Sequence, residues 1–135
     1  FFLKPKSEVA YLYNDYSIRQ GLEKMCNHGY TAIPVLDRNG GYVGTISEGD
    51  FLWHIVDGEN TQVEKTDIKD QENVKISEIM KKNKNESVNV TADMSELFEK
   101  AKTQNFVPVI DDRGYFIGIV TRQDIIKYFY EKCEF

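Results

Sequence analysis

The sequence predicts an α+β fold built from one unit that occurs twice. Residues 34–52 align with residues 108–126 at a constant offset of 74 without a gap, and six aligned positions are identical. In each copy a helical apolar period precedes two short strands around a turn, and a second helical period follows them. We therefore expect two β-α-β-β-α units related by a pseudo-twofold axis, with their sheets packed together and their helices outside.

The first copy begins with a short strand and a helix. Residues 8–12 predict the strand. Apolar side chains then recur at helical spacing from Ile18 to Cys26. Ser17 precedes this run and is suited to cap a helix, and Gly29 follows it and is suited to end one. These residues predict a helix that begins after Ser17 and ends at Gly29.

A hairpin and a second helix complete the first copy. The apolar runs 32–36 and 42–46 predict strands. The segment 37–41 between them contains Asp, Asn and Gly, which tolerate the backbone conformations of tight turns. From Glu48 the apolar residues return to helical spacing, and this helix is expected to end at Asp57-Gly58.

The second copy repeats this order with a helix-to-strand link that is two residues shorter. Its expected elements are a strand over 87–90, a helix carrying Leu97, Phe98 and Ala101, strands over 106–110 and 115–120, and a helix carrying Ile125, Ile126 and Phe129.

Between the copies lies a stretch rich in charged residues and poor in apolar spacing. We expect residues 1–58 to form the first repeat, residues 59–75 to form a charged linker, and residues 76–135 to form the second repeat. A short helix over 76–81 is expected at the start of the second repeat.

Composition disfavours several classes of function. The formal net charge is −5, so no basic field is available to hold nucleic acid. No apolar run approaches the roughly 20 residues that span a bilayer, so we expect no membrane insertion. Neither Cys26 nor Cys133 belongs to a Cys-x-x-Cys pair, which favours free thiols and a cytoplasmic location.

The sequence offers no set of residues suited to catalysis. The two histidines, His28 and His54, have no ligand or base partner at helical spacing, and structural roles are the simpler interpretation. We therefore expect no enzymatic activity, no catalytic residue, no metal site and no cofactor.

The strand ends carry the sharpest functional pattern, because both copies contain Gly-x-x-Ser/Thr-x-x-Asp. It occurs over residues 44–50 and again over residues 118–124. The hydroxyl lies where a strand gives way to a helix, whose free N–H groups favour an anion. The Asp three residues later is placed to accept hydrogen bonds from a ribose diol. A single match would be explained by a capping box, but two matches at equivalent positions favour a binding role.

Order and spacing of these motifs resemble the CBS domain, which is named for cystathionine β-synthase. The residues that carry the resemblance are 29–37, 41–44 and 47–50 in the first copy and 107–111, 118 and 121–124 in the second. The resemblance covers the chain apart from the linker. It implies a tandem pair, or Bateman module, with two clefts that bind AMP, ATP, S-adenosylmethionine or cyclic di-AMP as a regulatory ligand.

The resemblance also implies that each cleft is composite, with an adenine slot from one repeat and the Ser/Thr-x-x-Asp turn from the other. Cleft A is then formed by Val9, Ala10, Tyr30, Thr31, Ala32, Ile33, Thr121, Arg122 and Asp124. Cleft B is formed by Asn89, Thr91, Asn105, Phe106, Val107, Ser47, Glu48 and Asp50.

Charge favours cleft A as the better nucleotide site. Arg122 follows the hydroxyl there and suits phosphate, whereas Glu48 at the equivalent position of cleft B repels it. Lys4 and Lys6 are further sources of positive charge near cleft A. We expect an adenine nucleotide there, with AMP, ADP or ATP slightly ahead of cyclic di-AMP.

The resemblance leaves two functions open. The first is a regulatory module that passes its ligand state to a fused or separate effector protein. The alternative is a structural dimerisation module with no bound nucleotide. In both cases the apolar residues of the helices that end each repeat, among them Phe51, Leu52, Ile125 and Ile126, favour a twofold homodimer.

Overall fold

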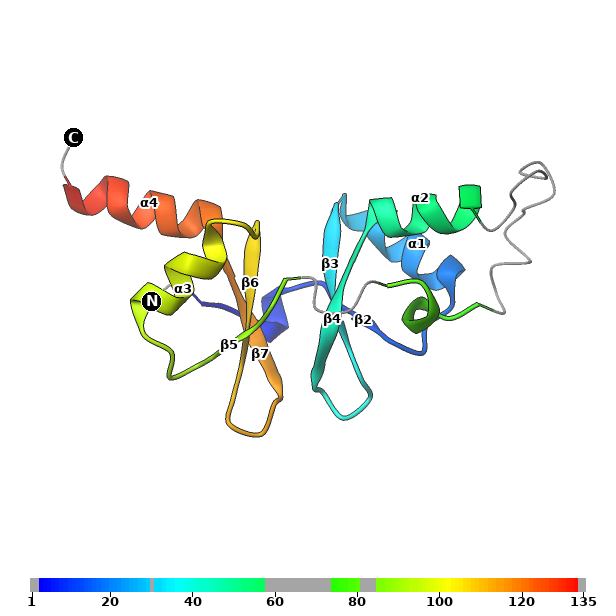
Figure 1. Ribbon diagram of the computed structural model, residues 1–135, viewed down its shortest axis with the longest axis horizontal. Coiled ribbons are helices and arrows are strands. Elements are labelled where there is room, and N and C mark those ends of the chain that lie inside the picture. The colour runs from blue at the N-terminus through cyan, green and yellow to red at the C-terminus, as the bar shows by residue number, and fades with distance from the viewer. Residues whose placement is uncertain (1–2, 30, 58–73, 81–84, 134–135) are drawn as a thin grey trace. The chain divides into compact units, whose positions relative to one another are not determined.

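The computed structural model describes residues 3–29, 31–57, 74–80 and 85–133, and these form two compact units (Figure 1). The first-repeat unit comprises Ala10–Arg38 and Val43–Lys84. The second-repeat unit comprises Phe1–Val9, Asn39–Tyr42 and Asn85–Phe135. The α+β class and the β-α-β-β-α order of both repeats are confirmed.

The first-repeat unit consists of a three-stranded sheet and its helices. Its elements are β2 (Leu12–Tyr13), α1 (Ile18–His28), β3 (Ala32–Leu36), β4 (Tyr42–Ser47), α2 (Glu48–Asp57) and the 3₁₀ turn η4 (Ile76–Glu78). The strand order is β2-β3-β4, and β2 runs parallel to β3 with Leu12 opposite Val35. In Figure 1 α1 and α2 lie side by side, which their contacts bear out.

Both predicted ends of α1 are confirmed. The Ser17 hydroxyl accepts a hydrogen bond from the Gln20 N–H at 3.2 Å, and the Gln20 side chain accepts one from the Ser17 N–H at 2.8 Å. This capping box satisfies two N–H groups that a helix start leaves without partners. Gly29 ends the helix at φ 69°, a conformation that residues with a Cβ adopt at a cost.

Residues 74–80 pack onto the first-repeat unit. Ile76 is fully buried in its core, and its N–H donates to the Tyr16 carbonyl at 2.9 Å. The Ile18 N–H donates to the Val74 carbonyl at the same distance. Ile76 joins a core made of Leu12, Ile18, Met25, Ile33, Val35, Ile46 and Phe51. The helix expected over 76–81 is a single 3₁₀ turn within the described residues.

The second-repeat unit is built on a four-stranded sheet of order β1-β7-β6-β5. Its elements are β1 (Lys4–Pro5), the 3₁₀ turn η1 (Lys6–Glu8), β5 (Val88–Asn89), α3 (Met94–Ala101), β6 (Phe106–Ile110), β7 (Phe116–Thr121) and α4 (Arg122–Cys133). Its core consists of Val88, Leu97, Val107, Val109, Val120 and Ile125.

The expected strand over 8–12 is wrong in its bounds. Glu8 ends the turn η1, and the strand is β2 at Leu12–Tyr13. A strand that the sequence did not predict, β1, pairs antiparallel with β7. Lys4 and Pro5 show no apolar alternation, so β1 depends on its backbone partner. Gly118 permits this pairing, because a Cβ there would overlap the Lys4 carbonyl oxygen.

The residues expected to form an apolar outer surface divide between core and surface. Phe51 and Ile125 are buried in the cores of their own units, whereas Leu52 and Ile126 are each 61% exposed. Among the described helices we find none with the length and apolar character needed to cross a membrane.

Candidate functional site

The Ser47-x-x-Asp50 turn forms a closed capping box at the start of α2. The Ser47 N–H donates to the Asp50 carboxylate at 2.9 Å, and the Asp50 N–H donates to the Ser47 hydroxyl at 3.3 Å. Asp50 is 4% exposed. Both functional groups are therefore engaged in holding the helix start, as the capping interpretation of this motif requires.

The equivalent turn of the second repeat is open. The Asp124 N–H donates to the Thr121 hydroxyl at 3.0 Å, so Thr121 caps α4. Within residues 3–29, 31–57, 74–80 and 85–133, the Asp124 carboxylate has neither a hydrogen bond nor an ion pair. Asp124 is half-buried rather than buried. The same motif thus leaves a carboxylate available in one repeat and not in the other.

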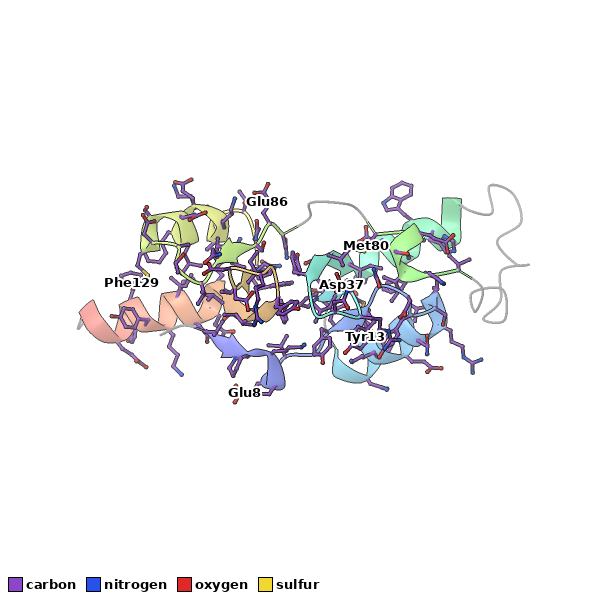
Figure 2. The ribbon with its side chains drawn as sticks, turned by 90° about the horizontal axis from the view of Figure 1, so that it is seen from below. Glu8, Tyr13, Asp37, Met80, Glu86 and Phe129 are labelled. Carbon is purple, nitrogen blue, oxygen red and sulfur yellow. The ribbon has the colours of Figure 1, made fainter. Side chains whose placement is uncertain are left out.

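Asp124 lines a cavity of about 290 Å³ within the second-repeat unit. Leu3, Lys4 and Glu8 form one wall, and Asp124, Lys127, Tyr128 and Glu131 on α4 form the other. Figure 2 labels Glu8 on the N-terminal segment. The two lysines place positive charge around the carboxylates, and the Tyr128 ring supplies an apolar surface. Such a mixture suits a polar ligand that carries both an anionic group and hydroxyls.

Arg122, expected to bind phosphate, caps a helix in this structure. Its Nε donates to the Ala101 carbonyl at 2.9 Å, and an Nη donates more weakly to the Lys102 carbonyl at 3.4 Å. These carbonyls lie at the end of α3, where a cation is favoured by the helix dipole. These two bonds hold the guanidinium of Arg122 at the end of α3.

In each repeat, the residue that precedes the first hairpin strand is hydrogen-bonded to the strand-to-helix turn of the same repeat. The Glu48 N–H donates to the Thr31 carbonyl at 2.9 Å, and the Arg122 N–H donates to the Asn105 carbonyl at 2.9 Å. The assignment of an adenine slot in one repeat to the turn of the other stays a prediction. Tyr30 lies outside the described residues.

Several residues expected in the adenine slots are core residues. Ile33, Phe106 and Val107 are at most 8% exposed, so their side chains serve the cores of their units. Thr31 and Asn105 are exposed, and Ala32 is half-buried. Val9 and Ala10, also half-buried, follow the turn η1. Among these residues, Thr31 and Asn105 are therefore the exposed polar ones.

Thr91 and Asn89 lie away from the turn that contains Asn105. Asn89 accepts hydrogen bonds from the Thr91 N–H and hydroxyl, both at 2.9 Å, and donates to Asp112 at 3.2 Å. Asn89 pairs with Ile110, at the opposite end of β6 from Asn105. The structure does not bring these two groups together.

Glu86, rather than Thr91, lies beside the segment that contains Asn105. Gln104 donates through Nε2 to the Glu86 carbonyl at 3.1 Å and to the Phe106 carbonyl at 3.2 Å. The Lys100 ammonium hydrogen-bonds the Glu86 carboxylate and lowers its pKa. The shorter helix-to-strand link of the second copy is the sequence pattern that identifies Glu86. Because of it, the two copies align at an offset of 76 rather than 74 before the helix, and Glu86 then matches Ala10 of the first copy.

No cluster of three or more His, Cys, Asp or Glu side chains suited to a metal ion occurs in the part of the chain that the structure describes. His54, half-buried on α2, belongs to no such cluster.

The family model of the CBS domain matches residues 3–57 and again residues 76–131. The chain belongs to the CBS domain family. Both matches contain one complete β-α-β-β-α repeat with its strand-to-helix turn, so the chain is a tandem CBS pair.

Related proteins match most of the chain. An uncharacterised protein of Methanopyrus kandleri is 32% identical over 106 residues, which are 77% of this chain and 49% of that protein. The chain thus spans about half the length of this curated relative. A CBS domain protein of Streptococcus pneumoniae superposes with a TM-score of 0.85 at 23% identity, covering 98% of this chain and 86% of that one.

A second solved structure is CbpB in complex with c-di-AMP. It superposes with a TM-score of 0.84 at 25% identity, covering 96% of this chain and 82% of that one.

Proposed function

We propose that this CBS pair is a regulatory module that binds an adenine nucleotide at the Thr121–Asp124 turn of its second repeat. The Asp124 carboxylate accepts hydrogen bonds from the ribose hydroxyls, and the ammonium group of Lys4 faces the phosphate. The ligand acts as a signal, and the module passes its presence to a fused or separate effector protein.

The observation that carries this proposal is the difference between the two turns. The Asp50 carboxylate accepts a hydrogen bond from the Ser47 N–H at 2.9 Å and is 4% exposed. The Asp124 carboxylate has no such bond among the described residues and faces a cavity with Lys4 and Lys127. A half-buried acceptor that lacks a partner is stabilised by a ligand that supplies donors.

The comparison with CbpB supports the choice of ligand class. That protein binds c-di-AMP and shares the fold over nearly the whole chain. AMP, ADP, ATP and cyclic di-AMP all present a ribose and a phosphate, the two groups for which the cavity has complementary charges. We therefore propose the adenine nucleotides as a class.

The Arg122 geometry changes the expected phosphate contact. Its guanidinium donates to the carbonyls at the end of α3, so the cations that line the cavity, Lys4 and Lys127, are better placed for phosphate. Lysine binds phosphate as a point charge and tolerates a range of ligand positions.

A thermal-shift screen tests the proposed function. The chain is heated with AMP, ADP, ATP, S-adenosylmethionine, NADH or cyclic di-AMP, each at concentrations up to the millimolar range. A ligand that binds the native state alone raises the free energy of unfolding by mass action, by about 2.7 kcal/mol at a hundred times its Kd. The unfolding midpoint temperature rises as a consequence. A rise with one or more adenine nucleotides supports the proposal. A flat response to all six compounds overturns it in favour of the structural dimerisation module.

Exposed apolar side chains on α2 and α4, the helices that end the two repeats, also favour dimerisation. Leu52 and Trp53 on α2 and Ile126 and Tyr130 on α4 are each at least 60% exposed. We infer a homodimer that covers these side chains, since self-complementary patches give closed twofold assemblies. Light scattering that reports a monomer at micromolar concentration would contradict this inference.

A further inference from the structure

The N-terminal segment Leu3–Val9 is attached to the second-repeat unit by a small interface. Its strand β1 pairs with β7 over two positions, Lys4 opposite Ile119 and Pro5 opposite Gly118. The turn η1 that follows contains no buried residue. A segment held by so few backbone bonds and so little apolar burial opens at a low free-energy cost.

Close backbone contact nevertheless gives β1 one defined position. Gly118 has no side chain, and the Lys4 carbonyl occupies the place where a Cβ would be. Leu3 reaches the same glycine, since its Cδ1 would lie 2.9 Å from that Cβ. The segment therefore docks in one register, and the residue that permits the docking belongs to the strand that leads to Thr121 and Asp124.

This segment is also one wall of the cavity that contains Asp124. Leu3, Lys4 and Glu8 line it from one side, and the first three turns of α4 line it from the other. Leu3 additionally lines a second, mostly apolar cavity of about 420 Å³ with Val88, Leu97 and Val120. The residue before β1 therefore lines both cavities.

We propose that the segment Leu3–Val9 is the element that reports occupancy of the Asp124 cavity: a bound nucleotide secures β1 on β7, and the empty cavity releases it. This inference rests on the proposed function and names its route of regulation. By linkage, a ligand that contacts both walls favours docking of the segment by the same free energy by which the docked segment favours binding of the ligand.

Hydrogen exchange measured with AMP and with cyclic di-AMP tests the inference. The informative amides are those of Lys4 and of Val9, whose N–H donates to the Lys6 carbonyl at 3.1 Å. If release of β1 abolishes binding, exchange at these amides slows by up to about a hundredfold at a hundred times the Kd. Amides in the middle of α3, in the same unit, serve as the internal control and change less.

Calorimetry on the same samples separates the two proposals. Heat of binding together with slower exchange in the segment supports both. Heat of binding with unchanged exchange at Lys4 and Val9 overturns the inference and leaves the proposed function standing. No heat with AMP, cyclic di-AMP, ADP or ATP overturns the proposed function and the inference with it.

Two variants test the reverse direction of the linkage. Gly118→Ala displaces β1, so we expect fast exchange in the segment and an affinity lowered at least tenfold, although Asp124 is unchanged. Leu3→Ala removes part of the wall without altering β7, and it should shift both quantities in the same direction by a smaller factor. If Leu3→Ala is folded and both variants bind the nucleotide as the wild type does, the inference is wrong.

Discussion

Gly21, near the start of α1, provides a sensitive test of how residues 74–80 pack on the first repeat. A Cβ at this position would lie 2.7 Å from Cδ1 of Ile76 and 3.1 Å from Cζ of Phe51. Replacing Gly by Ala in a helix interior ordinarily stabilises by about 1 kcal/mol. Inserting a methyl group into a filled core costs about 1 to 3 kcal/mol. We therefore expect Gly21→Ala to destabilise the protein by about 1 kcal/mol.

The clash can be relieved from the other side, because Ile76→Val deletes the atom that the new methyl meets first. On its own Ile76→Val costs about 0.5 to 1.5 kcal/mol. In its presence Gly21→Ala should be neutral or stabilising, so the two substitutions couple favourably by about 1 to 2 kcal/mol.

Urea unfolding of the four proteins at 25 °C gives the free energies of this double-mutant cycle. Gly49→Ala on α2 is a matched control, because the nearest atom to its Cβ is the Ser47 hydroxyl at an ordinary 3.5 Å. It should show no coupling to Ile76→Val. If Gly21→Ala and Ile76→Val are additive within about 0.5 kcal/mol, Ile76 does not pack on α1 as described.

Two further predictions concern helix ends in the second repeat. Arg122→Ala should lower the free energy of unfolding in urea by about 1 kcal/mol, since it removes the donor to the Ala101 carbonyl. It should leave nucleotide affinity within about threefold of wild type. A tenfold loss of affinity at unchanged stability would show instead that Arg122 binds phosphate. The pKa of Asp93 is lowered in the folded protein by hydrogen bonds from the Glu96 N–H and the Ser95 hydroxyl. The stability that Asp93 contributes is therefore fully present above the pKa of the unfolded state, and it is lost as the pH falls through the pKa of the folded state. Asp93→Asn should keep the cap but flatten the loss of stability below about pH 4, and an unchanged acid limb of the pH profile would contradict this.

Local patterns in the sequence predicted most of the fold. The ends of α1 follow from Ser17 and Gly29, whose chemistry acts within a few residues of each helix terminus. The hairpins follow from apolar runs around segments rich in Gly and Asp. These elements are specified by neighbours in the chain, so sequence periodicity is sufficient to find them.

Elements that depend on distant partners were harder to predict. Strand β1 contains no apolar pattern and exists because β7 offers its backbone and Gly118 leaves room for it. Ile76 follows the linker in sequence, but its side chain completes the core around Ile18 and Phe51. Neither pairing leaves a local trace, since Ile18 precedes Ile76 by more than fifty residues and β7 follows β1 by more than a hundred.

The sequence predicted where the two candidate turns lie, but not what their side chains contact. The two Ser/Thr-x-x-Asp turns lie at strand-to-helix junctions, as their spacing indicates. Which Asp is engaged by its own turn and which faces a cavity depends on side-chain geometry that identical motifs do not encode. Arg122 was expected at a phosphate because of its charge, whereas the nearby carbonyls of α3 are the acceptors that it contacts.

Titration calorimetry with AMP on wild type, Asp124→Asn and Asp50→Asn decides which of the two turns holds the nucleotide, because both substitutions preserve shape and remove one negative charge. A charge-assisted hydrogen bond contributes about 1.5 to 3 kcal/mol, so Asp124→Asn should weaken AMP about ten- to a hundredfold. Asp50→Asn should bind within about threefold of wild type, whatever it costs in stability. If Asp50→Asn abolishes binding while Asp124→Asn binds as wild type, the nucleotide occupies the turn of the first repeat and the account given for Asp124 is wrong.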